Sequence, residues 1–198
     1  PSQGVVRVCG FDATTRDARA RIGFCPDVDR LYEPLSGVKF VSWMLRYHGV
    51  GGREAKARAV EILTELGLAE NMHRPIREYS KGMRQRVRLG QALAHRPQFV
   101  LLDEPMTGLD PVARAELSEL IRELPQRGVG VLVSSHVLHE LEAVVDRVVL
   151  VHQGRMLADG KIDELREQLP ERPHRIRLRG ARLRDIAGEL ASWPEVEG

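Results

Sequence analysis

Residues 99–105 indicate the fold class more clearly than any other run; they read Phe99-Val100-Leu101-Leu102-Asp103-Glu104-Pro105. Four consecutive apolar residues predict a strand that is covered on both faces, as in a parallel sheet. Two carboxylates follow directly where this strand ends. Ligands of open α/β sheets bind beyond the carboxyl ends of the strands. We therefore expect Asp103 and Glu104 to lie at a ligand site.

The two acidic residues suit a site for phosphate and metal. Mg²⁺ favours a few carboxylates together with phosphate oxygens, so Asp103 is a candidate metal ligand. Glu104, one residue later, points another way and can orient or deprotonate a water molecule. This is the Walker B arrangement of nucleotide triphosphatases. Taken alone, the same run also describes a strand followed by an acidic turn.

The rest of the chain alternates strand and helix patterns around a helical segment. Alternation of this kind predicts an α/β core. Expected strands are Val5–Cys9, Arg21–Cys25, Phe99–Leu102, Gly130–Ser134, Arg147–Val151, Arg155–Ala158 and Arg175–Arg179; expected helices are Val38–Tyr47, Arg53–Leu66, Ser80–His95, one from Pro111, and His136–Val145.

Composition excludes several classes of protein. The chain has 198 residues, 42% of them hydrophobic, which fits one domain or two small lobes. Two cysteines exclude a disulfide scaffold. With 30 basic and 28 acidic residues, the net charge of +2 gives no case for nucleic-acid binding. The longest apolar runs, such as 128–133, fall far short of the ~20 residues that a membrane-spanning helix needs.

Two further motifs can serve the same chemistry. Tyr79-Ser80-Lys81-Gly82-Met83 opens a helix, and free N–H groups at a helix start bind anions. Ser134-Ser135-His136 ends a second strand, so His136 could reach the same phosphate. The alternatives are an ordinary serine cap and a helix-capping histidine.

The order and spacing of these motifs resemble the nucleotide-binding domain of ABC transporters of the bacterial exporter type. Residues 79–83 match the signature motif, 100–105 match Walker B, Gly108-Leu109-Asp110 matches the D-loop, and His136 matches the switch histidine. Four motifs in the right order form a strong signal, although each alone is weak. The resemblance covers nearly the whole chain up to about Gly160.

This resemblance implies an α/β fold, a P-loop NTPase core that carries a helical subdomain. Residues 1–29 would be part of the core, 30–96 the helical subdomain ending in the signature helix, and 97–168 the rest of the core. Residues 169–198 would begin a C-terminal extension.

The resemblance also implies a role for each matching residue. Two such domains pair head to tail and enclose two ATP molecules. Ser80, Lys81 and Gly82 would contact the nucleotide held by the partner, and Asp110 would couple the two sites. Asp103 would hold Mg²⁺, Glu104 would be the general base, and His136 would contact the γ-phosphate. Asp27 stands where the family's Q-loop has glutamine; it is shorter and charged. Lys81 and Met83 also depart from the commonest signature.

The implied partners are a transmembrane permease subunit and a second ATP-binding subunit, identical or different, with no nucleic acid. The implied location is the cytoplasmic face of the cell membrane, as a peripheral subunit. Export as the direction of transport rests on this resemblance.

The sequence contains no Gly-x-x-x-x-Gly-Lys-[Ser/Thr] loop to cradle the phosphates. We expect that loop just upstream of Pro1, in an ATPase that drives transport. The alternative is an accessory subunit that supplies only its signature motif to a competent partner. Glu104 and His136 favour the ATPase, because an accessory subunit has no evident use for them. A soluble ABC protein of translation or DNA repair would need a second domain or a long coiled coil.

Overall fold

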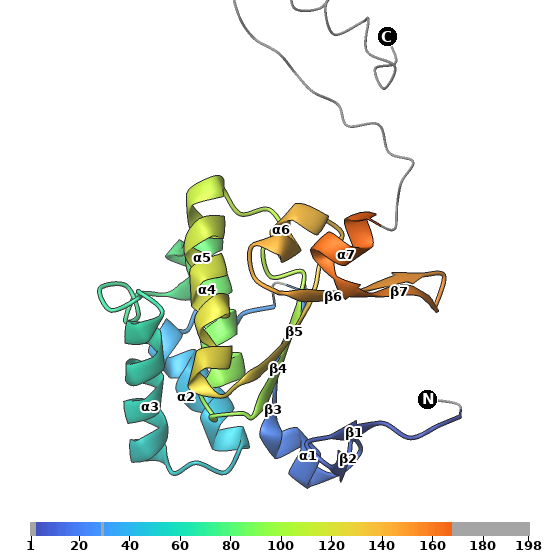
Figure 1. The fold of residues 1–198 in the computed structure, drawn as a ribbon. Helices are drawn as coiled ribbons and strands as arrows, with labels where there is room; N and C mark the ends of the chain where they lie inside the picture. Colours follow the sequence, from blue (N-terminus) through green and yellow to red (C-terminus); the bar gives the residue numbers. More distant parts are fainter. Residues whose placement is uncertain (1–2, 29, 168–198) are drawn as a thin grey trace, which may run out of the picture. The chain divides into compact units, whose positions relative to one another are not determined.

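A computed structural model describes residues 3–28 and 30–167, which form an α/β fold (Figure 1). The described residues divide into two units, one up to residue 148 and one from residue 149 to 167. The first unit holds helices α1 (Arg16–Arg21), α2 (Gly37–Tyr47), α3 (Gly52–Glu65), α4 (Lys81–Leu93), α5 (Pro111–Glu123) and α6 (Leu138–Glu142), and strands β1 (Arg7–Val8), β2 (Phe11–Asp12), β3 (Ile22–Cys25), β4 (Phe99–Asp103) and β5 (Gly130–Ser134). Two 3₁₀ turns, η1 (Ile76–Glu78) and η2 (Pro125–Arg127), complete it.

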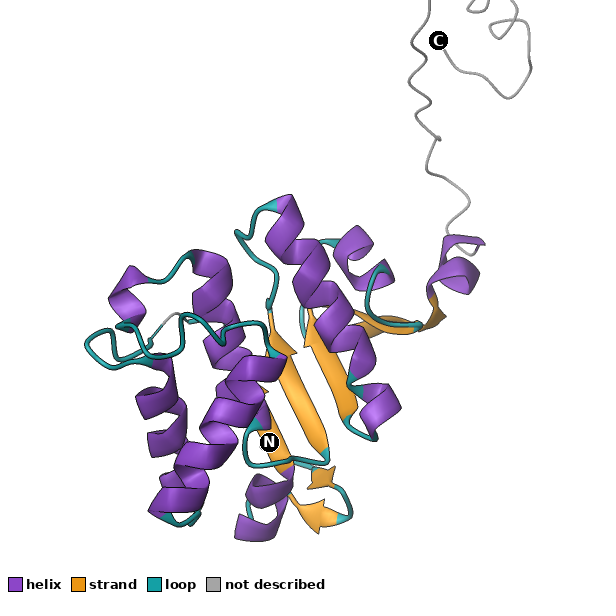
Figure 2. Cartoon of the chain, turned by 90° about the vertical axis from the view of Figure 1, so that its left-hand side faces the viewer, coloured by secondary structure: helices purple, strands orange, loops and turns teal. Residues whose placement is uncertain are grey.

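The central feature is a parallel sheet of three strands in the order β3-β4-β5. Long helices lie in front of these strands in Figure 2. Side chains from α4, β4 and α5 share one hydrophobic cluster, in which Leu89, Val100 and Leu117 are almost completely buried. Because the three strands are parallel, their carboxyl ends lie at a common edge of the sheet, where ligands of such sheets bind.

The expectation that the strand at 99–102 is covered on both faces is wrong, because Phe99 and Leu101 of β4 are only partly buried in the described structure. Val100 and Leu102 of β4 are buried, but Phe24 of β3 is 51% exposed and Leu132 of β5 is 55% exposed. Successive side chains of a strand point to opposite faces. The helices therefore cover one face of the sheet, and the residues that alternate with the buried ones remain accessible.

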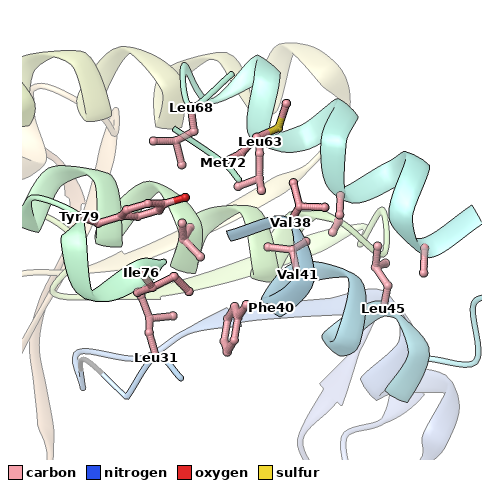
Figure 3. Close-up of a cluster of buried hydrophobic side chains, with 14 residues drawn as sticks. Leu31, Val38, Phe40, Val41, Leu45, Leu63, Leu68, Met72, Ile76 and Tyr79 are labelled. Atoms are coloured by element: carbon pink, nitrogen blue, oxygen red, sulfur yellow. The ribbon is translucent and has the colours of Figure 1, made fainter. Parts of the chain in front are cut away.

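Helices α2, α3 and α4 surround a second hydrophobic cluster (Figure 3). Ala55, Ala59 and Leu63 of α3 recur every fourth residue and are fully buried, as their helical spacing predicted. The hydroxyl of Tyr79 donates a 2.6 Å hydrogen bond to the carbonyl of Asn71 at the edge of this cluster. The shared cluster supports a helical subdomain, whose boundaries at residues 30 and 96 stay a prediction.

Most predicted elements are present, and the differences concern short elements. The strand expected at Val5–Cys9 is only two residues long, because the chain turns back through Cys9 and Gly10, whose φ angles are 49° and 84°. Strand β2 and helix α1 were not predicted, and the helix expected at His136–Val145 is confined to α6. The strand expected at Arg175–Arg179 and the extension at 169–198 lie outside the described residues.

The second unit begins inside strand β6 (Arg147–His152) and continues with β7 (Arg155–Lys161) and helix α7 (Ile162–Glu167). The two strands pair with each other. Gln153 and Gly154, both with positive φ, form the predicted turn between them. Among the described helices, none has both the length and the apolarity required to cross a membrane.

Gly23 tests the packing of the sheet against α4. A Cβ atom at this position would lie 2.1 Å from the backbone oxygen of Ala92, whereas a Cβ at Gly52 in α3 would meet open space. We expect Gly23→Ala to lower the free energy of unfolding by about 1–3 kcal/mol through overpacking. Gly52→Ala should raise it by about 0.4–1 kcal/mol by restricting the unfolded chain. Urea denaturation of both variants measures this, and a Gly23→Ala protein as stable as the unmodified chain would contradict the packing.

Candidate functional site

The register of the sheet brings the ends of β4 and β5 together. Asp103 pairs with Ser134 as the last residue of each strand. The Ser134 hydroxyl donates a 2.6 Å hydrogen bond to Asp103 Oδ1. Asp103 is exposed at the strand end. The hydrogen bond therefore fixes the Asp103 carboxylate at the edge of the sheet, where it remains accessible.

Glu104 leaves the line of the strand through a left-handed backbone conformation. Its φ of 47° is uncommon for a residue other than glycine. The backbone N–H of Glu104 points at Ser134, with its carbonyl oxygen 3.1 Å away and its hydroxyl 3.2 Å away. These contacts hold a costly backbone conformation at Glu104.

His136 lies against the Glu104 carboxylate. Its Nδ1 is 2.9 Å from both carboxylate oxygens, and the Thr107 hydroxyl donates a 3.0 Å hydrogen bond to one of them. The His136 side chain is 71% exposed and that of Glu104 is 21% exposed. The two residues expected to act on one phosphate, which are 32 positions apart in sequence, are therefore in direct contact. We call Asp103, Glu104, Ser134 and His136 the strand-end site.

Glu104 also raises the pKa of His136. The hydrogen bond to Glu104 and the charge of that carboxylate raise the pKa of His136 above its usual value, and the charges of Glu140 and Asp27 act in the same direction. The His136–Glu104 pair therefore stabilises the fold below the unfolded pKa of ~6.5, and this contribution is lost as the pH rises through the raised value.

Asp27 follows β3 at the same edge of the sheet. Its charge reaches His136, although Asp27 makes no direct contact with His136 or Glu104 in the described part of the chain. Two side chains of α4 fix the segment that leads to it. Gln85 donates a 3.6 Å hydrogen bond to the thiol of Cys25, and Arg88 donates one to the carbonyl of Pro26. Burial of Cys25 raises the pKa of its thiol.

The predicted signature and D-loop residues form a second group at the starts of α4 and α5. The Ser80 hydroxyl accepts a 3.2 Å hydrogen bond from the backbone N–H of Met83, and Asp110 accepts two of 3.0 Å from the first turn of α5. Ser80, Lys81 and Asp110 are exposed. With Gly82, we call this group the helix-start site.

Two positions of this region suit glycine because neighbouring atoms leave little room for a Cβ atom. A Cβ on Gly82 would lie 3.1 Å from the Cβ of Ala113, so glycine lets α4 approach α5. Gly108 has a φ of 68°, and a Cβ there would lie 1.9 Å from Lys81 Nζ. The ammonium group of Lys81 thus lies against the predicted D-loop of the same chain.

The structure does not join the helix-start site to the strand-end site. Within residues 3–28 and 30–167, no hydrogen bond or ion pair links Ser80, Lys81 or Asp110 to Glu104 or His136. Ser80 is a helix cap, as the alternative for its motif proposed, and Asp110 caps α5; both residues remain exposed. The helix-cap alternative for His136 is wrong, because α6 begins at Leu138 and the His136 ring contacts Glu104.

Sequence reasoning assigned no role to Ser134, although it noted the Ser-Ser-His run. Its place opposite Asp103 follows from the strand register, which the sequence does not state. Arg88 of α4, Arg114 of α5 and Glu140 of α6 were missed as well; no spacing rule connects them to the motifs.

The strand-end site has donors that suit Mg²⁺ together with phosphate. The described residues contain no cluster of three or more His, Cys, Asp or Glu side chains that could enclose a metal. Asp103 offers carboxylate oxygens on an exposed strand end beside the Ser134 hydroxyl. Mg²⁺ commonly takes one or two carboxylates and completes its shell with water and substrate phosphates, so this donor set fits.

Comparison with known proteins identifies the family of this chain. The family model described as "ABC transporter" matches residues 1–107, slightly more than half of the chain. The chain belongs to the ABC transporter family. A solved structure described as the ATP binding subunit of an ABC transporter superposes with a TM-score of 0.72 at 30% identity, covering 97% of this chain and 78% of that one. The fold is therefore that of an ABC ATP-binding subunit, as predicted.

Several curated ABC relatives come from bacteria. The daunorubicin resistance ATP-binding protein DrrA3 of Streptomyces coeruleorubidus is 39% identical over 171 residues, which cover 85% of this chain and 54% of the relative. The ABC transporter ATP-binding protein NatA of Bacillus subtilis is 35% identical over 170 residues, covering 84% and 69%. The chain spans little more than half the length of several such relatives.

The contact between His136 and Glu104 can be tested by titration. We expect Glu104→Gln to lower the pKa of His136 towards its ordinary value, because both main causes of the increase are lost. Histidine NMR signals followed against pH measure this. Glu119→Gln, an exposed change on α5, serves as the control and should leave the titration unchanged. If the pKa of His136 were the same in the Glu104→Gln protein as in the unmodified protein, the contact between His136 and Glu104 would be absent in solution.

Proposed function

We propose that this chain is the part of an ABC transporter's ATP-binding subunit in which the strand-end site receives the terminal phosphate of ATP. The observation that carries the proposal is the direct contact of His136 with Glu104, next to Asp103, at the carboxyl ends of adjacent parallel strands. An acid–base pair and a candidate metal ligand at one sheet edge are the parts that phosphoryl transfer to water requires.

Each residue of the strand-end site has a distinct task in this proposal. Asp103, held by Ser134, would bind Mg²⁺, and the bound cation would neutralise charge on the phosphate oxygens. Glu104 would accept a proton from the attacking water. His136 would donate a hydrogen bond to the γ-phosphate. The raised pKa of His136 favours its protonated form, which attracts a phosphate.

Glu104 must be released before it can act as a base. Both of its oxygens face His136, and one also accepts from Thr107. If His136 formed a hydrogen bond with the phosphate instead, the Glu104 carboxylate would be free to orient a water molecule. The 71% exposure of the His136 side chain gives it room for that movement. The observed pair is thus a resting arrangement of the site.

The helix-start site would act on a second nucleotide. Ser80, Lys81 and Asp110 are exposed and are not connected to the strand-end site of their own chain. Head-to-tail pairing of two ATP-binding subunits would bring Ser80, Lys81 and Gly82 to the phosphate held by the partner, with Asp110 between the two sites. Asp27 would sense the nucleotide beside His136.

The wider assignment follows the relatives. We propose a transmembrane permease as the partner, a peripheral position at the cytoplasmic face of the membrane, and export as the direction of transport. Three relatives whose names include daunorubicin resistance support export. The alternative remains an accessory subunit that supplies only the helix-start site, and that alternative makes Glu104 dispensable.

Replacement of the proposed base separates these two functions. In the protein expressed from its full coding sequence, we expect Glu104→Gln to lower the rate of ATP hydrolysis by about 10²–10⁴-fold, the usual contribution of a general base. ATP binding should persist, because glutamine keeps the shape of the side chain. Phosphate release and nucleotide affinity measure the two effects, with Glu119→Gln as the control. Unchanged hydrolysis would reject Glu104 as the base, whereas a lack of hydrolysis by the unmodified protein would favour the accessory role.

Replacement of the helix cap tests the action on a partner's nucleotide. Ser80→Arg should abolish hydrolysis, since a bulky side chain would occupy the surface that meets the partner, while each monomer still binds ATP. Ser80→Ala loses the same cap, worth about 1 kcal/mol, without adding bulk, and it should retain much more activity. Full hydrolysis by the Ser80→Arg protein would contradict the head-to-tail arrangement.

A further inference from the structure

A buried ion pair connects α5 with α6 beside the strand-end site. Arg114 Nε lies 3.3 Å from Glu140 Oε1. The Glu140 side chain is only 6% exposed and that of Arg114 is 33% exposed. A carboxylate buried to this degree requires a compensating charge and hydrogen bonds. Arg114 supplies the charge for Glu140.

One end of this pair holds the residues on both sides of His136. The second Glu140 oxygen accepts a 3.1 Å hydrogen bond from the Ser135 hydroxyl. The same hydroxyl accepts a 3.1 Å hydrogen bond from the backbone N–H of Val137. Glu140 therefore fixes the turn that presents His136, although it does not contact the imidazole itself.

The other end holds the predicted D-loop. Arg114 Nη2 donates a 3.2 Å hydrogen bond to the carbonyl oxygen of Leu109, which directly precedes Asp110. Arg114 therefore joins Leu109 to Glu140 through one hydrogen bond from Nη2 and one ion pair from Nε, which makes no hydrogen bond itself within the described residues. A shift of the Leu109 carbonyl must therefore move Arg114 or break one of its two contacts.

We propose that Arg114 and Glu140 are positioning residues that make the orientation of His136 depend on the conformation of residues 108–110. The chain of contacts runs from Leu109 through Arg114, Glu140 and Ser135 to the backbone on both sides of His136. This inference rests on the proposed function, in which Asp110 meets the partner subunit and His136 meets phosphate. Through these contacts, dimer formation would change the orientation of His136 within a single chain.

The link can be tested in the 198-residue chain without measuring activity. Asp110→Ala removes both hydrogen bonds from Asp110 to the start of α5 and so perturbs the residues next to Leu109. We expect this change to shift the NMR resonances of the His136 imidazole in the otherwise unmodified chain. In a Glu140→Gln background, where the ion pair is lost, the same change should leave those resonances where they are.

Two controls keep this result specific. Glu119→Gln, on the exposed surface of α5, should not shift His136 in either background. Ser135→Ala removes a smaller group from the same route and should also suppress the response to Asp110→Ala, so the test remains informative if Glu140→Gln does not fold. A His136 shift of equal size with and without the Glu140 carboxylate or the Ser135 hydroxyl overturns the proposal.

ATP hydrolysis by the protein expressed from its full coding sequence then distinguishes a positioning residue from a catalytic residue. Glu140→Gln should lower kcat by roughly tenfold to hundredfold, as expected when a reacting group is misplaced, with KM nearly unchanged. Arg114→Gln should have the same effect, and the double variant should be no worse than either single one, because both changes break one interaction. Additive losses overturn the proposal. A normal NMR response together with an inactive unmodified protein would instead reject the proposed function alone.

Discussion

The pairing of Asp103 with Ser134 at the ends of β4 and β5 is the constraint on which the site depends. Parallel pairing in this register puts the Ser134 hydroxyl 2.6 Å from the Asp103 carboxylate and its backbone oxygen 3.1 Å from the Glu104 N–H. A slip by one residue would turn the polar side chains to the opposite face of the sheet. The left-handed turn at Glu104 and its contact with His136 both require this register.

The sequence predicts the main helices and strands because its strongest patterns are local. The apolar run before Asp103, the fourfold spacing of Ala55, Ala59 and Leu63, and the cap at Ser80 each determine one element, and these elements are present. Short elements such as β2 and α1 carry too few residues for a periodic signal. The coverage of the sheet was overestimated, since a continuous apolar run does not reveal how many helices will pack on it.

The sequence predicted the residues of the candidate site, but it predicted only some of the contacts between them. Strand order implies that Asp103 and His136 share one edge of the sheet, but it does not imply that His136 contacts Glu104. The ion pair of Arg114 with Glu140 depends on how α5 and α6 pack, which no motif spacing encodes. Local sequence thus specifies the chemical groups, and tertiary packing specifies which of them share a charge or a hydrogen bond.

The most direct test of this account is an experimental structure of the full-length protein with ATP bound. The account predicts that the terminal phosphate lies at the ends of β4 and β5, next to Asp103 and Glu104. In that structure His136 should contact the phosphate and no longer the Glu104 carboxylate. A terminal phosphate bound away from this edge of the sheet, with the His136–Glu104 pair intact, would contradict it.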